Sequence, residues 1–200
     1  MPETFTDRLT AAFDYARTLH VHQVRKGTSI PYLSHLMAVA AIVMESGGDE
    51  DQVIASLLHD AVEDQGHEGR TKAEIAERWG ERVAGIVMAC TDAETVPKPP
   101  WRERKEKYLA HLSTAPVEVR RVVAADKLHN AQAILNDYRQ LGDLIWRRFN
   151  VKAPEILWYY RAVVTRLREA DSAGALKDLM DRLEKVVSVL EREVAVGQGS

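Results

Sequence analysis

Hydrophobic residues recur at intervals of three and four positions along almost the whole chain, and sustained alternation of period two is absent. This is the period of an amphipathic α-helix, so the pattern predicts an all-α fold, a compact helical bundle. Asp49 and Ser34 are the residue types that cap helix N-termini, and each precedes a periodic segment. The expected helices cover residues 7–22, 34–47, 49–64, 71–80, 81–91, 101–112, 116–138 and 154–170.

The last segment has a narrower hydrophobic seam, with spacings of three and four in alternation. Such a seam is typical of a helix that lies back on its own domain or pairs with a second copy. With 200 residues, the chain has room for one domain of ordinary size. We therefore expect one domain over residues 1–170 and a C-terminal helix over 171–200, in a monomer or a homodimer. The seam consists of Leu176, Leu179, Leu183, Val186, Leu190 and Val194.

Composition and charge narrow the range of partners. Twenty-seven basic residues stand against thirty acidic ones, giving a net charge of −3, which argues against a nucleic-acid or membrane-surface binder. The longest apolar run, residues 36–44, is far shorter than the roughly 18 residues that cross a bilayer. The lone cysteine, Cys90, and an N-terminus without a secretion signal predict a cytoplasmic protein.

One cluster of polar residues interrupts an otherwise apolar helix. His59, Asp60, Glu63 and Asp64 are spaced so that an unbroken helix over 49–64 would carry all four on one flank. Three carboxylates on one flank repel each other, and a divalent cation would relieve that repulsion. We therefore expect a cation on this flank.

Two further side chains are candidates to complete the coordination of such a cation. His35 begins the preceding helix, and Asp126 lies in a strongly apolar part of the long helix over 116–138. A buried carboxylate without a partner would cost several kcal/mol. Lys127 points about 100° away around the helix and is expected to be a poor partner for Asp126, whereas Asn130 shares its face.

These residues fall into motifs that resemble those of the HD-domain metal phosphohydrolases, and within them the (p)ppGpp hydrolase branch. The similarity extends over roughly residues 9–164. The motifs are Arg25-Lys26-Gly27 leading to Pro31-Tyr32-Leu33-Ser34-His35, then His59-Asp60-Ala61-Val62-Glu63-Asp64, the basic pair Arg104-Lys105, and Ala125-Asp126-Lys127-Leu128-His129-Asn130.

The resemblance implies a role for each matching position. The expected ligands of one divalent ion, usually manganese in this branch, are His35, His59, Asp60 and Asp126. Glu63 and Asp64 would orient and deprotonate the attacking water. The expected contacts of a small-molecule nucleotide are Arg25, Lys26, Tyr32, Asn130, Arg104 and Lys105.

The implied reaction releases pyrophosphate from the 3′ position of ppGpp or pppGpp, and the protein is expected to be a stand-alone small alarmone hydrolase. After Asn130, however, the chain has Gln132 and Ala133 where the branch tends to have arginine and a polar residue. Two alternatives therefore stay open: an HD phosphohydrolase acting on nucleoside monophosphates or on the 2′-phosphate of NADPH, and a metal-binding nucleotide sensor without turnover. For His129 we expect a supporting role beside the metal ligands, and for His20 a structural one.

Overall fold

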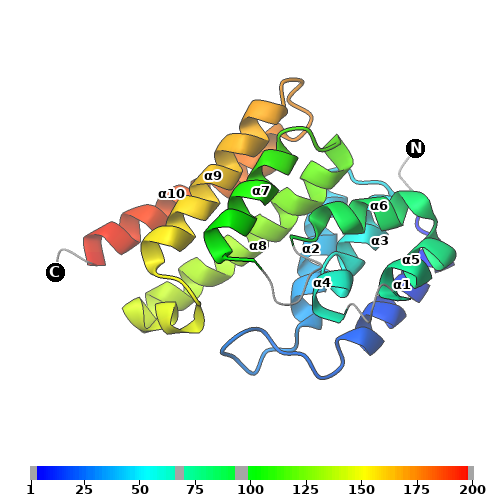
Figure 1. Cartoon of the computed structure of the whole chain (residues 1–200), viewed down its shortest axis with the longest axis horizontal. Helices are drawn as coiled ribbons and strands as arrows, with labels where there is room; N and C mark the ends of the chain where they lie inside the picture. The colour runs from blue at the N-terminus through cyan, green and yellow to red at the C-terminus, as the bar shows by residue number, and fades with distance from the viewer. Residues whose placement is uncertain (1–3, 66–69, 93–98, 198–200) are drawn as a thin grey trace.

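The protein is a bundle of helices, as predicted (Figure 1). The computed structural model describes residues 4–65, 70–92 and 99–197. Within these ranges the only extended pairing is an isolated bridge between Val24 and Pro31. The helices are α1 (Asp7–Leu19), α2 (Leu33–Glu45), α3 (Glu50–Leu58), α4 (Ala61–Gln65), α5 (Arg70–Trp79), α6 (Glu81–Cys90), α7 (Trp101–Leu112), α8 (Val117–Leu141), the 3₁₀ helix η1 (Gly142–Arg148), α9 (Ala153–Ala170) and α10 (Lys177–Gly197).

Helix α8 is the element around which the others are arranged. It packs against α2, α3, α6, η1, α9 and α10 (Figure 1). Buried hydrophobic residues from all of these helices form one continuous core. The apolar segment that contains Asp126 therefore lies at the centre of the molecule, where α2 and α3 also meet.

The predicted single helix over 49–64 is wrong, because the chain leaves the helix at His59 and Asp60. Helix α3 ends at Leu58, and α4 begins only at Ala61. The ring of His59 bonds the carbonyl oxygen of Ser56 at 2.7 Å, the oxygen that a continuous helix would offer to the N–H of Asp60.

The predicted N-terminal cap is confirmed for α3 and is wrong for α2. The carboxylate of Asp49 accepts the N–H of Gln52 at 3.0 Å and caps α3. Ser34, the expected cap of α2, lies inside the helix, which begins at Leu33. The carbonyl of Pro31 accepts the N–H of Ser34 at 3.1 Å, so the first turn forms without a side-chain cap.

The C-terminal helix α10 packs against α8 and α9 of its own chain. Four residues of the predicted seam are buried in α10, and Leu176 is buried just before the helix begins, whereas Val186 is only half-buried and Met180 and Val187 are buried in addition. In the described part of the chain, no helix is both long and apolar enough to cross a membrane.

Candidate active site

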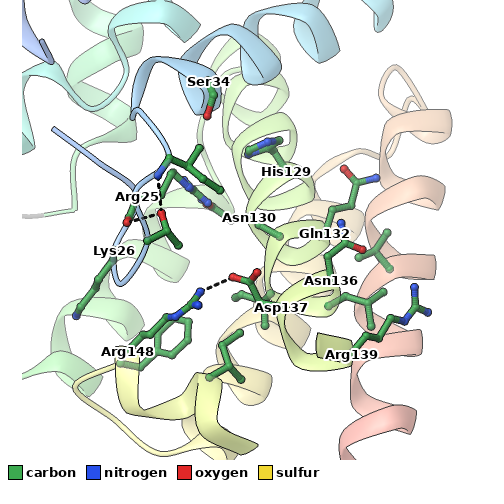
Figure 2. A pocket seen from close by; sticks show the side chains of 18 of the residues that line it. Arg25, Lys26, Ser34, His129, Asn130, Gln132, Asn136, Asp137, Arg139 and Arg148 are labelled. Carbon is green, nitrogen blue, oxygen red and sulfur yellow. Dashed lines mark hydrogen bonds and ion pairs between the residues drawn. The ribbon is translucent and has the colours of Figure 1, made fainter. Parts of the chain in front are cut away.

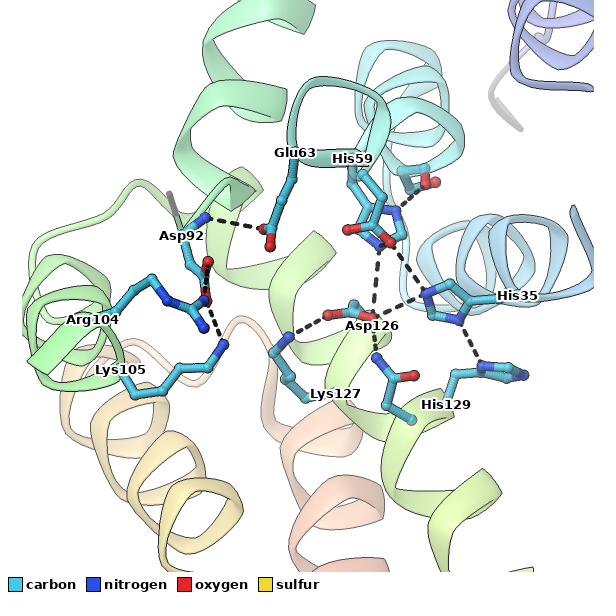
Figure 3. A network of polar contacts seen from close by, with 12 residues as sticks. His35, His59, Glu63, Asp92, Arg104, Lys105, Asp126, Lys127 and His129 are labelled. Atoms are coloured by element: carbon cyan, nitrogen blue, oxygen red, sulfur yellow. Dashed lines mark hydrogen bonds and ion pairs between the residues drawn. The ribbon is translucent and has the colours of Figure 1, made fainter. Parts of the chain in front are cut away.

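Four of the predicted residues meet beside the N-terminal half of α8 (Figure 3). His35 comes from α2, His59 and Asp60 from the break between α3 and α4, and Asp126 from α8. The Nε2 atom of His35 lies 3.2 Å from Oδ1 of Asp126 and 3.7 Å from Oδ2 of Asp60. The Nε2 atom of His59 lies 3.0 Å from Oδ2 of Asp60 and 3.6 Å from Oδ1 of Asp126. Residues distant in sequence thus present two nitrogens and two oxygens to one small space.

The two imidazoles are prepared to bind a cation. Both rings are buried, with His35 0% and His59 3% exposed, and neither Nε2 has a hydrogen-bond partner among the described residues. The Nδ1 atom of His59 donates to the carbonyl of Ser56, so its Nε2 carries the lone pair in the neutral ring. A buried nitrogen without a partner is costly, and a cation between the rings would remove that cost. Three of the groups, from His35, His59 and Asp126, have ligand atoms within 4.8 Å of one another. The donor set therefore fits a divalent cation.

His129 supports His35 from behind. Its Nδ1 lies 2.8 Å from Nδ1 of His35. Burial, with the positive charge of Arg25 nearby, lowers the pKa of His129 to about 4, so the ring is neutral at pH 7. Its Nδ1 can then accept the proton of His35 and leave the Nε2 of His35 as the ligand atom.

The charges of the four converging side chains, His35, His59, Asp60 and Asp126, also favour a cation; we call the place where these side chains meet the corner. Burial alone would lower the pKa of His59, but the carboxylates of Asp60 and Asp126 raise it well above its usual value. Burial alone would raise the pKa of both carboxyls, yet it lies well below the usual range because of the neighbouring positive groups. The two carboxylates are thus ionised, and in the metal-free site they favour a proton on His59 at the place that a divalent cation would take.

Lys127 contradicts the expectation that it would be a poor partner for Asp126. Its Nζ lies 2.5 Å from Oδ2 of Asp126, and both side chains are mostly buried. The Cα–Cβ bonds of adjacent helical residues do point about 100° apart, but the four-carbon stem of lysine is long enough for its ammonium group to reach back to Asp126. Burial alone would lower the pKa of Lys127, whereas Asp126 raises it well above its usual value, so this residue is an ammonium.

The two acidic residues of α4 point in different directions, because adjacent residues of a helix are rotated by about 100° from each other. Oε2 of Glu63 lies 3.4 Å from the backbone nitrogen of Asp92, which donates to it (Figure 3). Oδ2 of Asp64 accepts the side-chain amide of Gln23 at 2.7 Å. Each carboxylate is therefore held by a group from outside α4.

Two more of the predicted residues, Tyr32 and Asn130, form hydrogen bonds with the carboxylates of Asp60 and Asp126. The hydroxyl of Tyr32 donates to Oδ2 of Asp60 at 2.5 Å, and burial keeps that hydroxyl protonated by raising the pKa of Tyr32. The amide of Asn130 donates to Oδ1 of Asp126 at 2.5 Å and accepts from Arg25 at 2.8 Å. Asn130 thus connects the segment 25–31, which we call the basic loop, to the corner where the carboxylates meet.

A cavity of about 990 Å³ opens beside this corner (Figure 2). Arg25 and Lys26 line it from the basic loop, and Asn130 lines it from α8. Arg148 of η1 completes this cationic side; it is paired at 2.5 Å with Asp137, which also lines the cavity. The stem of Arg148 lies against Gly27, where an added Cβ would come within 2.7 Å of it. A cavity of this size and charge suits an anionic small molecule.

The structure does not bring Arg104 and Lys105 to the cavity. Both side chains are bonded to the carboxylate of Asp92, which is 6% exposed. They lie on the other side of Glu63 from the imidazoles, with Lys127 between them and Asp126 (Figure 3). Cations therefore flank the corner on two sides: the basic loop on one and α7 with Lys127 on the other.

Sequence reasoning did not single out several residues that hold this site. Asp92 and Lys127 form its ion pairs, and Gln23 contacts Asp64. A cation next to a buried carboxylate is a signal that the sequence carries in Asp126-Lys127, but helical spacing alone predicts that the two side chains diverge. Asp92 and Gln23 lie outside regular helices, where spacing carries no directional information.

Fold and geometry together define a class: a helical protein with a buried histidine–aspartate cation site. Comparison with known families agrees, because the HD domain matches residues 12–149. The chain belongs to the HD-domain family. All four converging groups lie within the matched residues.

Three known proteins show where in the family its similarities lie. The guanosine-3′,5′-bis(diphosphate) 3′-pyrophosphohydrolase MESH1 of Xenopus tropicalis is 34% identical over 164 residues, which are 80% of this chain and 85% of that protein. A protein of Aquifex aeolicus with the same enzyme name is 34% identical over 131 residues, which are 64% of this chain but 18% of that longer protein. A solved structure of a metazoan SpoT ortholog, described as hydrolysing ppGpp, has the same fold, with a TM-score of 0.74, 21% identity and coverage of 96% of this chain and 98% of the other.

Proposed function

We propose that this protein is a metal-dependent (p)ppGpp 3′-pyrophosphohydrolase. The observation that carries the proposal is the convergence of four ligand groups, with two unpartnered buried Nε2 atoms, beside a cationic cavity. The similarity to MESH1 over most of both chains supports the choice of substrate. We propose Mn²⁺ as the cation, held by His35, His59, Asp60 and Asp126. Once bound, the ion would supply Lewis acidity that polarises a phosphoryl oxygen and makes water more acidic.

The carboxylates of α4 supply the base for the reaction. Glu63 or Asp64 takes a proton from water as its oxygen adds to the phosphorus next to the ribose 3′ oxygen. The bond between that phosphorus and the 3′ oxygen breaks, the 3′ oxygen takes up a proton, and pyrophosphate leaves. The products are GDP from ppGpp and GTP from pppGpp.

The cations on the two sides of the corner would have different tasks. On the side of the cavity, Arg25, Lys26 and Asn130 would hold the nucleotide; all three line the cavity. On the other side, Arg104 and Lys105 would offset the charge of the departing pyrophosphate, for which they must share or give up Asp92. Tyr32 would orient Asp60 and form part of the cavity wall.

The test is incubation of the Mn²⁺-loaded protein with ppGpp, followed by quantification of nucleotide, pyrophosphate and phosphate. We expect GDP and pyrophosphate in equal amounts. Phosphate without pyrophosphate would point to the alternative HD phosphohydrolase activities, for which nucleoside monophosphates and NADPH are the substrates to try next. Nucleotide binding without turnover would point to a sensor.

A variant separates turnover from binding. Glu63→Gln keeps the shape of the side chain but removes the base, so we expect turnover to fall by about 10²-fold or more while nucleotide binding persists. Glu103→Gln, at an exposed position of α7, is the matched control and should leave turnover unchanged. Full turnover by Glu63→Gln would assign the base to Asp64 instead.

The compartment and the assembly stay predictions. We propose the cytoplasm and either a monomer or a homodimer, with a first unit over residues 1–170 and a C-terminal helix after it. Light scattering on the eluting peak of a sizing column distinguishes the two assemblies. Removal of residues 171–200 tests whether the first unit folds without its last helix.

A further inference from the structure

His20 is a buried histidine outside the set of presumed metal ligands. It follows the last residue of α1 and is 3% exposed. Its Nδ1 lies 2.6 Å from Oε1 of Gln23. Because an amide oxygen only accepts, the proton of this bond belongs to His20. The backbone N–H of Gln23 also donates to the carbonyl of His20 at 3.0 Å, so the two residues are joined twice.

The side chain of Gln23 is bonded to His20 at its oxygen and to Asp64 at its nitrogen. Its Nε2 donates to Oδ2 of Asp64 at 2.7 Å. If the amide of Gln23 turned over, its oxygen would face the carboxylate of Asp64, and two acceptors would repel each other. The N–H of His20 prevents that rotation because it requires the oxygen of Gln23 on its own side. One oxygen of Asp64 is thus fixed by a donor whose direction is set from the buried ring.

The ring of His20 has a second contact with the site. It stacks on Tyr32, with ring centroids 5.3 Å apart and planes at 26°. The hydroxyl of Tyr32 in turn donates to Asp60. The backbone N–H of Tyr32 donates to the carbonyl of Gln23 at 2.9 Å, which makes His20, Gln23 and Tyr32 one compact unit at the base of the basic loop.

We propose that His20 is a positioning residue: through the side-chain amide of Gln23 it sets the orientation of the Asp64 carboxylate relative to the imidazole–carboxylate corner. This inference rests on the proposed function for the importance of Asp64, but the hydrogen-bonded chain itself does not. Its effect belongs to the chemical step, since neither His20 nor Gln23 lines the cavity among the described residues. The proposal therefore predicts a change in kcat and not in KM.

Two substitutions of His20 separate positioning from mere packing. His20→Phe keeps a flat ring on Tyr32 and loses the N–H, whereas His20→Asn restores a donor near the place of Nδ1 and loses the ring. We expect His20→Phe to lower kcat for ppGpp by about 10- to 100-fold with KM unchanged. This is the usual size of the effect when a hydrogen-bond partner that orients the residues of a metal site is removed. We expect His20→Asn to retain more kcat than His20→Phe although it is the less stable protein. His111→Phe, at an exposed position of α7, is the control.

A purely structural role predicts the opposite order, in which kcat follows thermal stability and His20→Phe is the better enzyme. That order, or a loss confined to KM, would overturn the proposal. A second measurement does not depend on turnover: side-chain amide exchange of Gln23 followed by NMR in the wild type and in His20→Phe. We expect exchange to become at least about 10-fold faster in the variant as the bond is lost. Unchanged exchange would overturn the positioning chain even if ppGpp is hydrolysed, whereas faster exchange in a protein that does not hydrolyse ppGpp would refute only the proposed function.

Discussion

The pair between Lys127 and Asp126 provides a test of where the metal binds. The ammonium contacts Oδ2 of Asp126 at 2.5 Å, while Oδ1 of the same carboxylate faces the imidazoles. Without metal, Lys127 is the main positive partner of this buried charge. With metal, the carboxylate has a second and stronger one. Substitution of Lys127 by methionine should therefore matter much more in the metal-free protein.

The size of the effect follows from burial. The side chains of Lys127 and Asp126 are 16% and 10% exposed. Loss of one partner of a buried pair costs about 3–5 kcal/mol, and the residual exposure favours the lower end, about 3 kcal/mol. For a domain of this size, each kcal/mol corresponds to about 2–4 °C in Tm. Lys127→Met is thus expected to melt about 6–12 °C below the wild type in the presence of chelator.

The assay is thermal unfolding of both proteins, with chelator and with saturating Mn²⁺. We expect the difference in Tm between them to shrink by at least half with the metal, because the ion compensates Asp126 and Lys127 no longer repels it. Lys107→Met, at an exposed position of α7, should match the wild type in both conditions. A difference that is the same with and without metal would refute the idea that Asp126 is a ligand.

Three further predictions concern the surroundings of the corner. Gly27→Ala places a Cβ at φ +73° and within 2.7 Å of Arg148, so we expect the basic loop to shift and KM for ppGpp to rise while kcat changes little; steady-state kinetics checks this. Tyr32→Phe removes the donor to Asp60, and titration calorimetry should show Mn²⁺ affinity about 10- to 100-fold weaker with nearly the same Tm. Burial alone would raise the pKa of Asp92, but Lys105 and Arg104 lower it below its usual value. The ion pairs of Asp92 therefore stabilise the fold above the pKa of an unfolded aspartate, about 3.9, and this stabilisation is lost as the pH falls below that value. The Tm difference between the wild type and Asp92→Asn should therefore be largest near pH 7 and vanish in acid; a difference independent of pH would contradict the assignment.

The parts of the site that follow from helical periodicity could be predicted from the sequence. His35 and Asp126 are polar residues on the buried faces of regular helices, and burial of a polar group demands a partner. Periodicity identified the helices, and the demand for partners made these two residues candidates to join His59 and Asp60. The resemblance to the HD-domain phosphohydrolases then implied that the four form one set.

Directions that depend on irregular backbone could not be predicted in this way. The helix breaks at His59 and Asp60, where the ring of His59 bonds the carbonyl of Ser56, and no spacing rule anticipates such a bond. Glu63 faces Asp92 and Asp64 faces Gln23, and both of these partners lie outside regular helices, where spacing gives no direction. Likewise, nothing in the sequence of α7 indicates that its basic pair is held by a carboxylate from another segment.

The count of metal ions on the purified protein tests the central claim most directly. The protein is purified without chelator, dialysed against Mn²⁺ and then buffer, and analysed by inductively coupled plasma mass spectrometry, beside a variant with both His59→Ala and Asp126→Asn. The account predicts a single tightly bound ion per chain in the wild type and none in the variant, provided that the variant still shows a helical circular dichroism spectrum. Equal metal contents in the two proteins, or a wild type that binds none, would contradict it.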